Sequence, residues 1–296
     1  MTGHALPPAI GEKSLLASAR DGDRSAFDAL IGACIPRLTA VLRRMIGNPD
    51  DVADVLQQSL LKAWGALAAF RGEARFATWL QAIAMRQALD FLREKRRYRA
   101  GALLFAQHEC ERTGAAAEVM AIVAGSDFHF DAHEHIAYCF GCVGRSLAPE
   151  LQAALLLREV YELSNDEAAA QLGVSNSVLR HRVAEARETM MDRYDRLCAL
   201  VGKQGVCYQC EGLRAGAHEE RRGPDPRAAL GPAKSTREEK WRRRLQIVRD
   251  APLGEGVSAR LHERFSRYVD RLEESLERTC DADDIPTREA CVPPGP

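Results

Sequence analysis

Apolar residues recur along this chain at the three- and four-residue intervals of amphipathic helices. One stripe follows the helix break at Asn48-Pro49 and consists of Val52, Val55, Leu56, Leu60 and Trp64. A second stripe begins at Phe76, after a loop at 71–74, and continues toward a basic cluster at 93–99. Alternating β-branched runs, which are typical of strands, are absent. The pattern therefore predicts an all-α protein.

A second helical unit is predicted between residues 147 and 197. Pro149 suits the first turn of a helix that extends to Tyr161. Ser164 and Glu167 have the spacing of a capping box, which predicts a short helix ending near Leu172. Gly173 would form the turn, and Ser175 would cap a helix reaching about Arg193. Helix, short glycine turn and helix together are typical of a DNA-binding helix-turn-helix.

The second helix of this motif would enter the major groove of DNA. Four early polar positions would meet base edges: Asn176, Ser177, Arg180 and His181. Arg182 and Arg187 would reach phosphates. The small core would consist of Ala168, Ala169, Leu172, Val174, Val178, Leu179 and Val183. The alternative is an ordinary helical hairpin, which the acidic balance of this segment favours.

Composition limits the classes of protein to consider. Of the 296 residues, 46% are hydrophobic and 28% charged, so packed cores are expected rather than wholesale disorder. Basic side chains number 41 and acidic ones 42, but residues 1–100 carry 15 basic and 10 acidic side chains, whereas residues 101–197 have a net negative charge. No apolar run approaches the ~20 residues of a spanning helix, and no secretory signal is recognisable. We expect a cytoplasmic protein without a membrane partner.

The cysteines suggest a further site. Two CxxC pairs flank the second helical unit, Cys139 with Cys142 and Cys207 with Cys210. Four thiolates could bind zinc tetrahedrally, with His135 as an alternative ligand beside the first pair. The pairs could also act as a reversible dithiol switch, or they could simply pack.

Both helical units resemble the two conserved domains of bacterial RNA polymerase sigma factors of the extracytoplasmic-function type. The matching runs are DVADVLQQSLLKAW (51–64), FATWLQAIAMRQALDFLREKRR (76–97) and LAPELQAALLLREVYELSNDEAAAQLGVSNSVLRHRVAEAR (147–187). They occur in family order and together are far more specific than a helix-turn-helix alone. The resemblance implies a non-enzymatic subunit that binds the polymerase core enzyme and promoter DNA and directs transcription initiation. It requires no cofactor, and structural or regulatory zinc would be an addition.

The resemblance also implies three sets of contact residues. The polymerase-binding face would comprise Asp51, Asp54, Gln57, Gln58 and Lys62. The promoter element nearest the start site would be engaged by Trp79, Arg86, Asp90, Arg93, Arg96 and Arg97. The distal element would be held by Ser175, Asn176, Ser177, Arg180, His181, Arg182 and Arg187. The chain departs from the family at Gln58, where an acidic residue is usual, and at Arg86, where asparagine is frequent.

Strand opening exposes unstacked bases, which a protein can capture beside a basic surface. The loop FRGEARF (70–76) would form the wall of such a pocket. In the alternative interpretation, Phe70 and Phe76 belong to the core. The basic cluster beyond Arg93 is a candidate phosphate-contacting patch or, alternatively, a solvated helix end.

These observations predict two small helical domains, a helical bundle and a helix-turn-helix, joined by a linker and followed by a helical extension. The predicted bounds are 12–99, 100–146 with its His/Cys cluster, 147–197 and 198–296. An apolar stripe at 257–276 must bury against this chain or a partner. Control would come from a separate anti-sigma factor or from the extension docking on the second domain. The rival function is a stand-alone helix-turn-helix transcriptional regulator.

Overall fold

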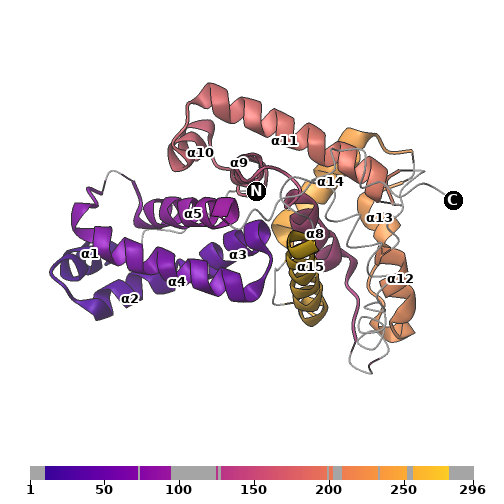
Figure 1. Ribbon diagram of the computed structural model, residues 1–296, viewed down its shortest axis with the longest axis horizontal. Helices are drawn as coiled ribbons and strands as arrows, with labels where there is room; N and C mark the ends of the chain where they lie inside the picture. The colour runs from indigo at the N-terminus through magenta and orange to yellow at the C-terminus, as the bar shows by residue number, and fades with distance from the viewer. Residues whose placement is uncertain are drawn as a thin grey trace.

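The computed structural model describes residues 11–72, 74–94, 125, 128–198, 200–202, 209–232, 234–251 and 256–279, without the side chains of 268–269 and 272–279. These residues are mostly helical, and one isolated bridge joins Phe130 to Arg222 (Figure 1). The predicted all-α fold is confirmed. Among them, no single helix is both long and apolar enough to span a membrane, although the bent pair Arg24–Gly32 and Ile35–Ile46 passes that test together.

The first unit, called here the N-terminal bundle, contains five α-helices. Asn48 accepts a hydrogen bond from the backbone N–H of Asp50 at 2.9 Å, so the predicted break starts a new helix. Phe27, Leu38 and Leu80 lie in a core built from this bundle's own helices. The elements are α1 (Glu12–Arg20), α2 (Arg24–Gly32), α3 (Ile35–Ile46), α4 (Pro49–Ala66), the 3₁₀ turn η1 (Leu67–Ala69) and α5 (Phe76–Glu94).

The remaining helices form a second assembly, called here the C-terminal unit, in which segments distant in sequence lie side by side (Figure 1). Its elements are α8 (Ala132–Gly144), α9 (Pro149–Leu155), the π-helical turn η2 (Leu156–Val160), α10 (Asn165–Leu172), α11 (Asn176–Leu197), α12 (Gln209–Gly216), the 3₁₀ turn η3 (Glu219–Arg221), α13 (Pro226–Leu230), α14 (Arg237–Asp250) and α15 (Ala259–Thr279).

The local signals of the helix-turn-helix act as predicted. Ser164 and Glu167 exchange the two hydrogen bonds of a capping box at the start of α10. Gly173 ends α10 with a φ of 64°, in the left-handed region that glycine adopts without a Cβ penalty. The Ser175 side chain accepts from the backbone N–H of Val178 and caps α11. Three short-range interactions therefore set the bounds of the motif.

Segment 100–146 was predicted to be a linker, but its described part includes a helix that packs against other helices. Its residues 132–144 form α8, which contacts α3, α11 and α14 near the middle of the molecule (Figure 1). Phe140 and Ile136 on α8 are almost completely buried. The small residues of α8 allow close packing of helices around it, and at Gly141 the backbone of Arg44 on α3 approaches closely.

The extension is part of this core. Trp241, Leu245 and Val248 of α14 belong to one hydrophobic cluster with residues of α3, α5, α8, α9 and α11. Arg44 of the N-terminal bundle donates to the carbonyl of Val248 at 2.7 Å. Helix α14, itself part of the C-terminal unit, is therefore also packed against the N-terminal bundle.

The apolar stripe at 257–276 is partly accounted for within this chain. Leu261 and Phe265 of α15 are buried in a separate small cluster with Phe128, Phe130 and Leu213. Val257 is exposed. The other stripe members, Tyr268, Val269, Leu272 and Leu276, lie outside the described side chains.

Candidate nucleic-acid interface

Helix α5 presents the predicted contacts to the proximal promoter element. Arg86 and Asp90 are exposed on it. Trp79 is half-buried and packs against Phe70 and Phe76, with ring centroids 4.8 Å and 5.7 Å away. The aromatic contacts fix the indole beside the 70–76 loop, so it can offer one edge to a ligand while its other side completes the core.

The two phenylalanines of that loop are themselves core residues. Phe70 and Phe76 are buried, and both belong to the hydrophobic cluster of the N-terminal bundle. This placement matches the core interpretation rather than a pocket wall. Arg20 donates to the carbonyl of Phe70, which anchors the start of the loop to α1.

Arg93 is engaged with the C-terminal unit. Its guanidinium lies 3.2 Å from Asp90 and 2.7 Å from Glu150 of α9. Burial is the largest single influence on Glu150 and raises its pKa, but hydrogen bonds and positive charges, chiefly those of Arg93, together outweigh it and leave the pKa lowered. Arg93 therefore bridges two units before any DNA is present. Arg96 and Arg97 lie outside the described residues.

The predicted polymerase-binding face lies along α4. Its Asp54, Gln57, Gln58 and Lys62 are exposed and Asp51 is half-buried. Leu61 lies among them with 53% of its surface exposed, outside the buried stripe. Leu61 was not among the predicted contact residues, although its position beside Lys62 and off the apolar stripe indicates an exposed side chain. A polar face around one exposed leucine has the composition of a protein-binding surface.

The start of α11 carries the predicted base contacts. Ser175, Ser177, Arg180 and His181 are exposed, and Asn176 donates to Asp166 of α10 at 2.6 Å. Asn176 therefore helps to hold the turn together.

Val178 corrects the predicted core of the motif, because 41% of its surface is exposed. It follows Ser177 in the first turn of α11, close in sequence to the predicted base contacts. An exposed methyl-bearing side chain there could contact the methyl group of thymine.

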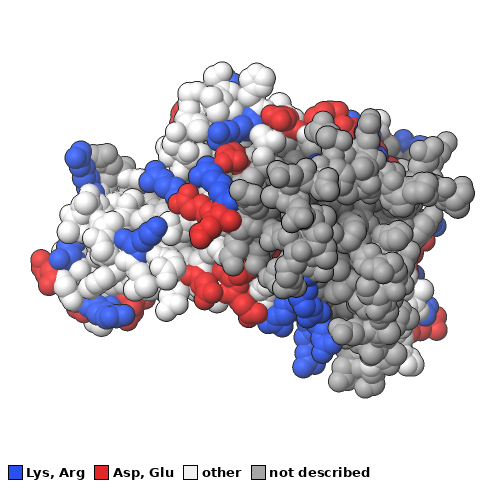
Figure 2. Space-filling view, in the orientation of Figure 1, with Lys and Arg blue, Asp and Glu red and all other residues white. Residues whose placement is uncertain are grey.

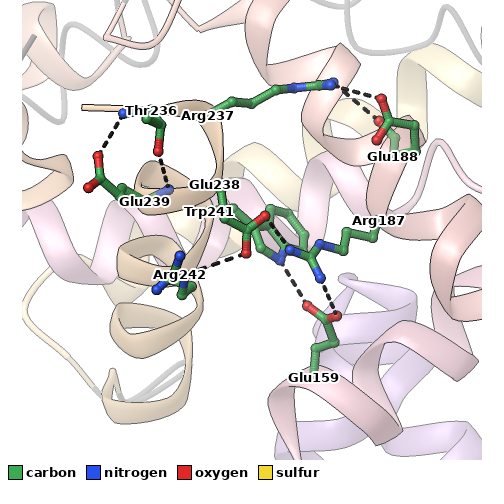
Figure 3. A network of polar contacts seen from close by, with 9 residues as sticks. All are labelled: Glu159, Arg187, Glu188, Thr236, Arg237, Glu238, Glu239, Trp241 and Arg242. Carbon is green, nitrogen blue, oxygen red and sulfur yellow. Dashed lines mark hydrogen bonds and ion pairs between the residues drawn. The ribbon is translucent and has the colours of Figure 1, made fainter. Parts of the chain in front are cut away.

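The two predicted phosphate contacts lie farther along α11. Arg182 is half-buried and contributes to the lowered pKa of Glu150, after the larger influences of burial and Arg93. Arg187 forms ion pairs with Glu238 of α14 and with Glu159, the latter at 3.8 Å (Figure 3). The structure thus places Arg187 against the extension.

The first turn of α14 continues this network. Arg237 reaches Glu188 at 2.8 Å, Asp195 at 2.9 Å and Asp192, all on α11 (Figure 3 shows the first of these). Trp241 donates from Nε1 to Glu159 at 2.8 Å. Helix α14 is therefore attached to the second half of the helix whose first half carries the predicted base contacts.

Basic side chains are interspersed with acidic ones over the described part of the face shown in Figure 2. A mixed surface gives little long-range attraction for DNA. Recognition would then rest on a few exposed side chains such as Arg86 and Arg180 rather than on net charge.

The cysteine pairs do not form a metal site in the part of the chain that the structure describes. No group of three or more His, Cys, Asp or Glu side chains is arranged there to hold an ion. Cys139 and Cys142 lie on α8 and Cys210 on α12, whereas Cys207 is outside the described residues. His135 is buried and faces His262 of α15 at 3.1 Å. The described residues therefore give zinc no support.

Comparisons with known proteins find two matched regions in this chain. Residues 30–98 match the family model described as sigma-70 region 2, and residues 142–190 match sigma-70 region 4. The ECF RNA polymerase sigma-E factor of Salmonella typhimurium is 28% identical over 190 residues, which are 64% of this chain and 96% of that protein. Its counterpart in Escherichia coli K12 is 27% identical with the same coverage.

Among solved structures, CnrH in complex with the cytosolic domain of CnrY aligns with 62% of this chain and 97% of that chain. The sequence identity is 23% and the TM-score 0.44.

Proposed function

We propose that this chain, which belongs to the extracytoplasmic-function sigma factors, binds the RNA polymerase core and directs it to promoters through separate surfaces on α4, α5 and α11. Sigma factors are non-enzymatic initiation factors, so no catalytic residue is assigned. We place the protein with its polymerase in the cytoplasm. It requires no cofactor for this role.

The polymerase surface is the exposed face of α4. Gln57 and Gln58 would supply amide hydrogen bonds, and Lys62 a charge, around the apolar contact of Leu61. Because Gln58 cannot provide the charge of the acidic residue usual in the family, Leu61 would carry more of the affinity here.

The proximal promoter element would bind along α5. Arg86 is exposed and has no hydrogen-bond or ion-pair partner among the described residues, so its five donors are available to bases or phosphates. Trp79 would stack on an unpaired base from the edge of its aromatic cluster.

The distal promoter element would bind at the start of α11. Arg180 and His181 are exposed and, within the described chain, form no hydrogen bond or ion pair. Arg180 would pair with guanine, and Ser177 and Val178 would contact neighbouring bases. Ser175 and Asn176 would act mainly by fixing the helix start, through the cap and the bond to Asp166.

The contrast among arginines carries this proposal. Arg86 and Arg180 are available to a ligand, whereas Arg93 and Arg187 are committed to carboxylates of this chain. We infer that the committed arginines restrain the units, and that docking of α14 on α11 provides intramolecular control in place of, or beside, an anti-sigma factor.

The test is an initiation assay with purified core polymerase, this chain and promoters mapped after its overexpression. Arg86→Ala and Arg180→Ala should each reduce transcript about 5- to 100-fold, since a good base contact discriminates by ~1–3 kcal/mol. Arg242→Ala is the matched control, because Arg242 is an exposed arginine on α14, 71% exposed. Its transcript level should stay within about twofold of the unmodified chain.

A transcript level in Arg180→Ala equal to that in Arg242→Ala would overturn the assignment of α11. Binding to duplex promoter without core, together with no initiation when core is added, would favour the stand-alone regulator.

A further inference from the structure

The connection that leads into the helix-turn-helix contains a backbone conformation that glutamate rarely adopts. Glu162 lies between the end of η2 and the start of α10, and its φ is 53°. Within the described chain it is the one non-glycine residue with a positive φ. A residue with a Cβ is disfavoured in this left-handed region, where glycine is usual after a helix end. Glu162 therefore needs support from its surroundings to keep this conformation.

The helix before this connection ends irregularly. Its last residues wind as the π-helical turn η2, and the backbone N–H of Tyr161 donates to the carbonyl of Leu156 at 2.9 Å. The N–H of Leu163 then reaches back to the carbonyl of Leu157 at 3.0 Å. The last carbonyls of a helix have no partner within the helix. The carbonyl of Glu159, in this final turn, therefore depends on donors from elsewhere.

Arg249 of α14 supplies those donors. Its Nε and Nη2 both donate to the carbonyl of Glu159, at 2.9 Å and 2.5 Å. Its Nη1 lies 2.9 Å from the carboxylate of Glu162. A positive charge is also favourable at the C-terminal end of a helix. One guanidinium from the extension therefore caps the end of η2 and binds the side chain of the left-handed residue.

A second side chain of α14 holds the same turn. Trp241 lies about two turns before Arg249, and its Nε1 donates to the carboxylate of Glu159 at 2.8 Å (Figure 3). Arg187 of α11 lies 3.8 Å from this carboxylate. The side chain of Glu159 is thus bound by Trp241 and Arg187, and its backbone by Arg249. Buried Trp241 fixes α14 where Arg249 can reach the connection.

We propose that Arg249 is a positioning residue for the helix-turn-helix, an inference that rests on the proposed function of α11. By holding the turn at Glu162, Arg249 sets the direction in which α10 and α11 leave α9. It thereby sets the placement of Arg180 at the distal promoter element. The extension would in this way take part in promoter recognition without contacting DNA through Arg249.

Loss of Arg249 should alter the orientation of the motif rather than unfold it. Helix α11 also packs on α9, and Ala168 and Leu179 of the motif belong to the large core. The ion pair itself contributes little stability, because 56% of the Glu162 side chain and 28% of the Arg249 side chain are exposed. Its value is that it favours a φ that glutamate would otherwise avoid.

The experiment measures initiation by core polymerase with the full chain on two promoters, one intact and one whose distal element is weakened by base substitutions. The ratio of the two transcript levels, called here the distal ratio, reports recognition by α11. A loss of active protein lowers both transcripts and leaves the distal ratio unchanged. Arg249→Ala should lower it at least about fivefold, because a displaced Arg180 loses most of a base contact. Arg242→Ala on the same helix, at a side chain that is 71% exposed, should leave it within about twofold.

Glycine at position 162 provides a rescue, because glycine adopts a φ of 53° without an ion pair. Glu162→Gly alone should keep the distal ratio within about twofold of the unmodified chain. Glu162→Gly combined with Arg249→Ala should have a distal ratio at least about twofold above that of Arg249→Ala alone. Such a recovery would identify the conformation of the turn as what Arg249 controls, and no recovery would overturn the proposal.

Equal distal ratios in Arg249→Ala and Arg242→Ala would also overturn it. If circular dichroism shows that Arg249→Ala does not fold, Arg249→Lys decides. Lysine keeps the charge but lacks the fork that binds carbonyl and carboxylate together, so the distal ratio should fall at least about threefold, and an unchanged ratio would contradict the proposal.

Arg180→Ala separates this inference from the proposed function. A distal ratio near one in the unmodified chain, unaffected by Arg180→Ala, would remove the function proposed for α11 and this inference with it. A high distal ratio that Arg180→Ala abolishes and Arg249→Ala preserves would overturn the positioning role of Arg249 alone.

Discussion

The two regions that match sigma-factor models differ in how they are stabilised. The N-terminal bundle has a core of its own, formed by α1, α2, α3, α4 and α5. The helix-turn-helix is packed into a larger core that needs α8, which precedes most of the matched segment, and α14, which follows it. A recognisable family motif therefore does not mark the limits of the unit that folds.

The largest effect is expected from Trp241→Ala. It removes a buried indole that lies 5.8 Å from the Phe140 ring and donates to Glu159, so it should cost about 3–5 kcal/mol of unfolding free energy. Denaturant unfolding measures this cost. Leu61→Ala is the control and should cost under about 0.5 kcal/mol because Leu61 is exposed. A cost for Trp241→Ala as small as the control's would mean that α14 is a dispensable attachment.

Acidification should destabilise the C-terminal unit through two buried histidines, His135 of α8 and His262 of α15. Burial lowers the pKa of His135 to about 4 and that of His262 well below its usual 6.5. Between about pH 6.5 and 4 the unfolded chain binds more protons than the folded one. The free energy of unfolding that the neutral histidines contribute is therefore complete above pH 6.5 and is lost as the pH falls. Protonation of His135 should cost roughly 1.4 kcal/mol per pH unit within this window, and that of His262 acts in the same direction.

The measurement is the thermal midpoint from pH 7 to pH 5. His262→Gln should make the thermal midpoint decline less steeply as the pH falls. His133→Gln, at an exposed position on the helix that carries His135, should leave the decline unchanged. If both variants decline as steeply as the unmodified protein, the buried pair is not the source of acid sensitivity.

A smaller effect is expected where α14 is attached to α11 by charge. Arg237→Ala removes ion pairs with Glu188, Asp192 and Asp195, and should cost about 1 kcal/mol, because it breaks a network on a partly exposed surface. Arg242→Ala removes a single exposed pair and should cost about 0–0.5 kcal/mol. Urea unfolding at low and high salt measures both costs. A cost for Arg237→Ala that does not shrink in high salt would contradict an electrostatic attachment.

The smallest effect concerns two capping boxes, one at the start of α10 and one at the start of α14. Hydrogen bonds from Ser164 lower the pKa of Glu167 at the start of α10, and those from Thr236 lower the pKa of Glu239 at the start of α14. Both carboxylates should titrate below their usual 4.5 in a carboxyl-detected NMR titration. Their stabilising effect is present above that value and is lost as pH falls. A normal value for Glu239 alone would indicate that the start of α14 is frayed.

Local interactions explain what could be predicted from the sequence. Asn48, Ser164, Gly173 and Ser175 act on backbone groups within a few residues, so the helix bounds they imply match the structure. Of the stripe predicted for α4, Val52 and Val55 are buried and Leu56, Leu60 and Trp64 partly buried, whereas the buried Ser59 and Ala63 were not predicted.

Non-local packing explains what could not be predicted. Nothing in the composition around Phe140 indicates that Trp241 packs against it from a hundred residues away. The partners of Arg187 and Arg93 lie on other helices, so their engagement became visible only when those helices were placed. Val178 fell on the expected apolar spacing, yet the short motif leaves it at the surface.

If α14 is a structural part of the DNA-binding unit, Trp241→Ala should speed amide hydrogen exchange in α9 and α11 as well as in α14. The amides of α2 should be unchanged, because α2 belongs to the separate core. Faster exchange confined to α14, with α9 and α11 as protected as in the unmodified protein, would exclude this structural role for α14.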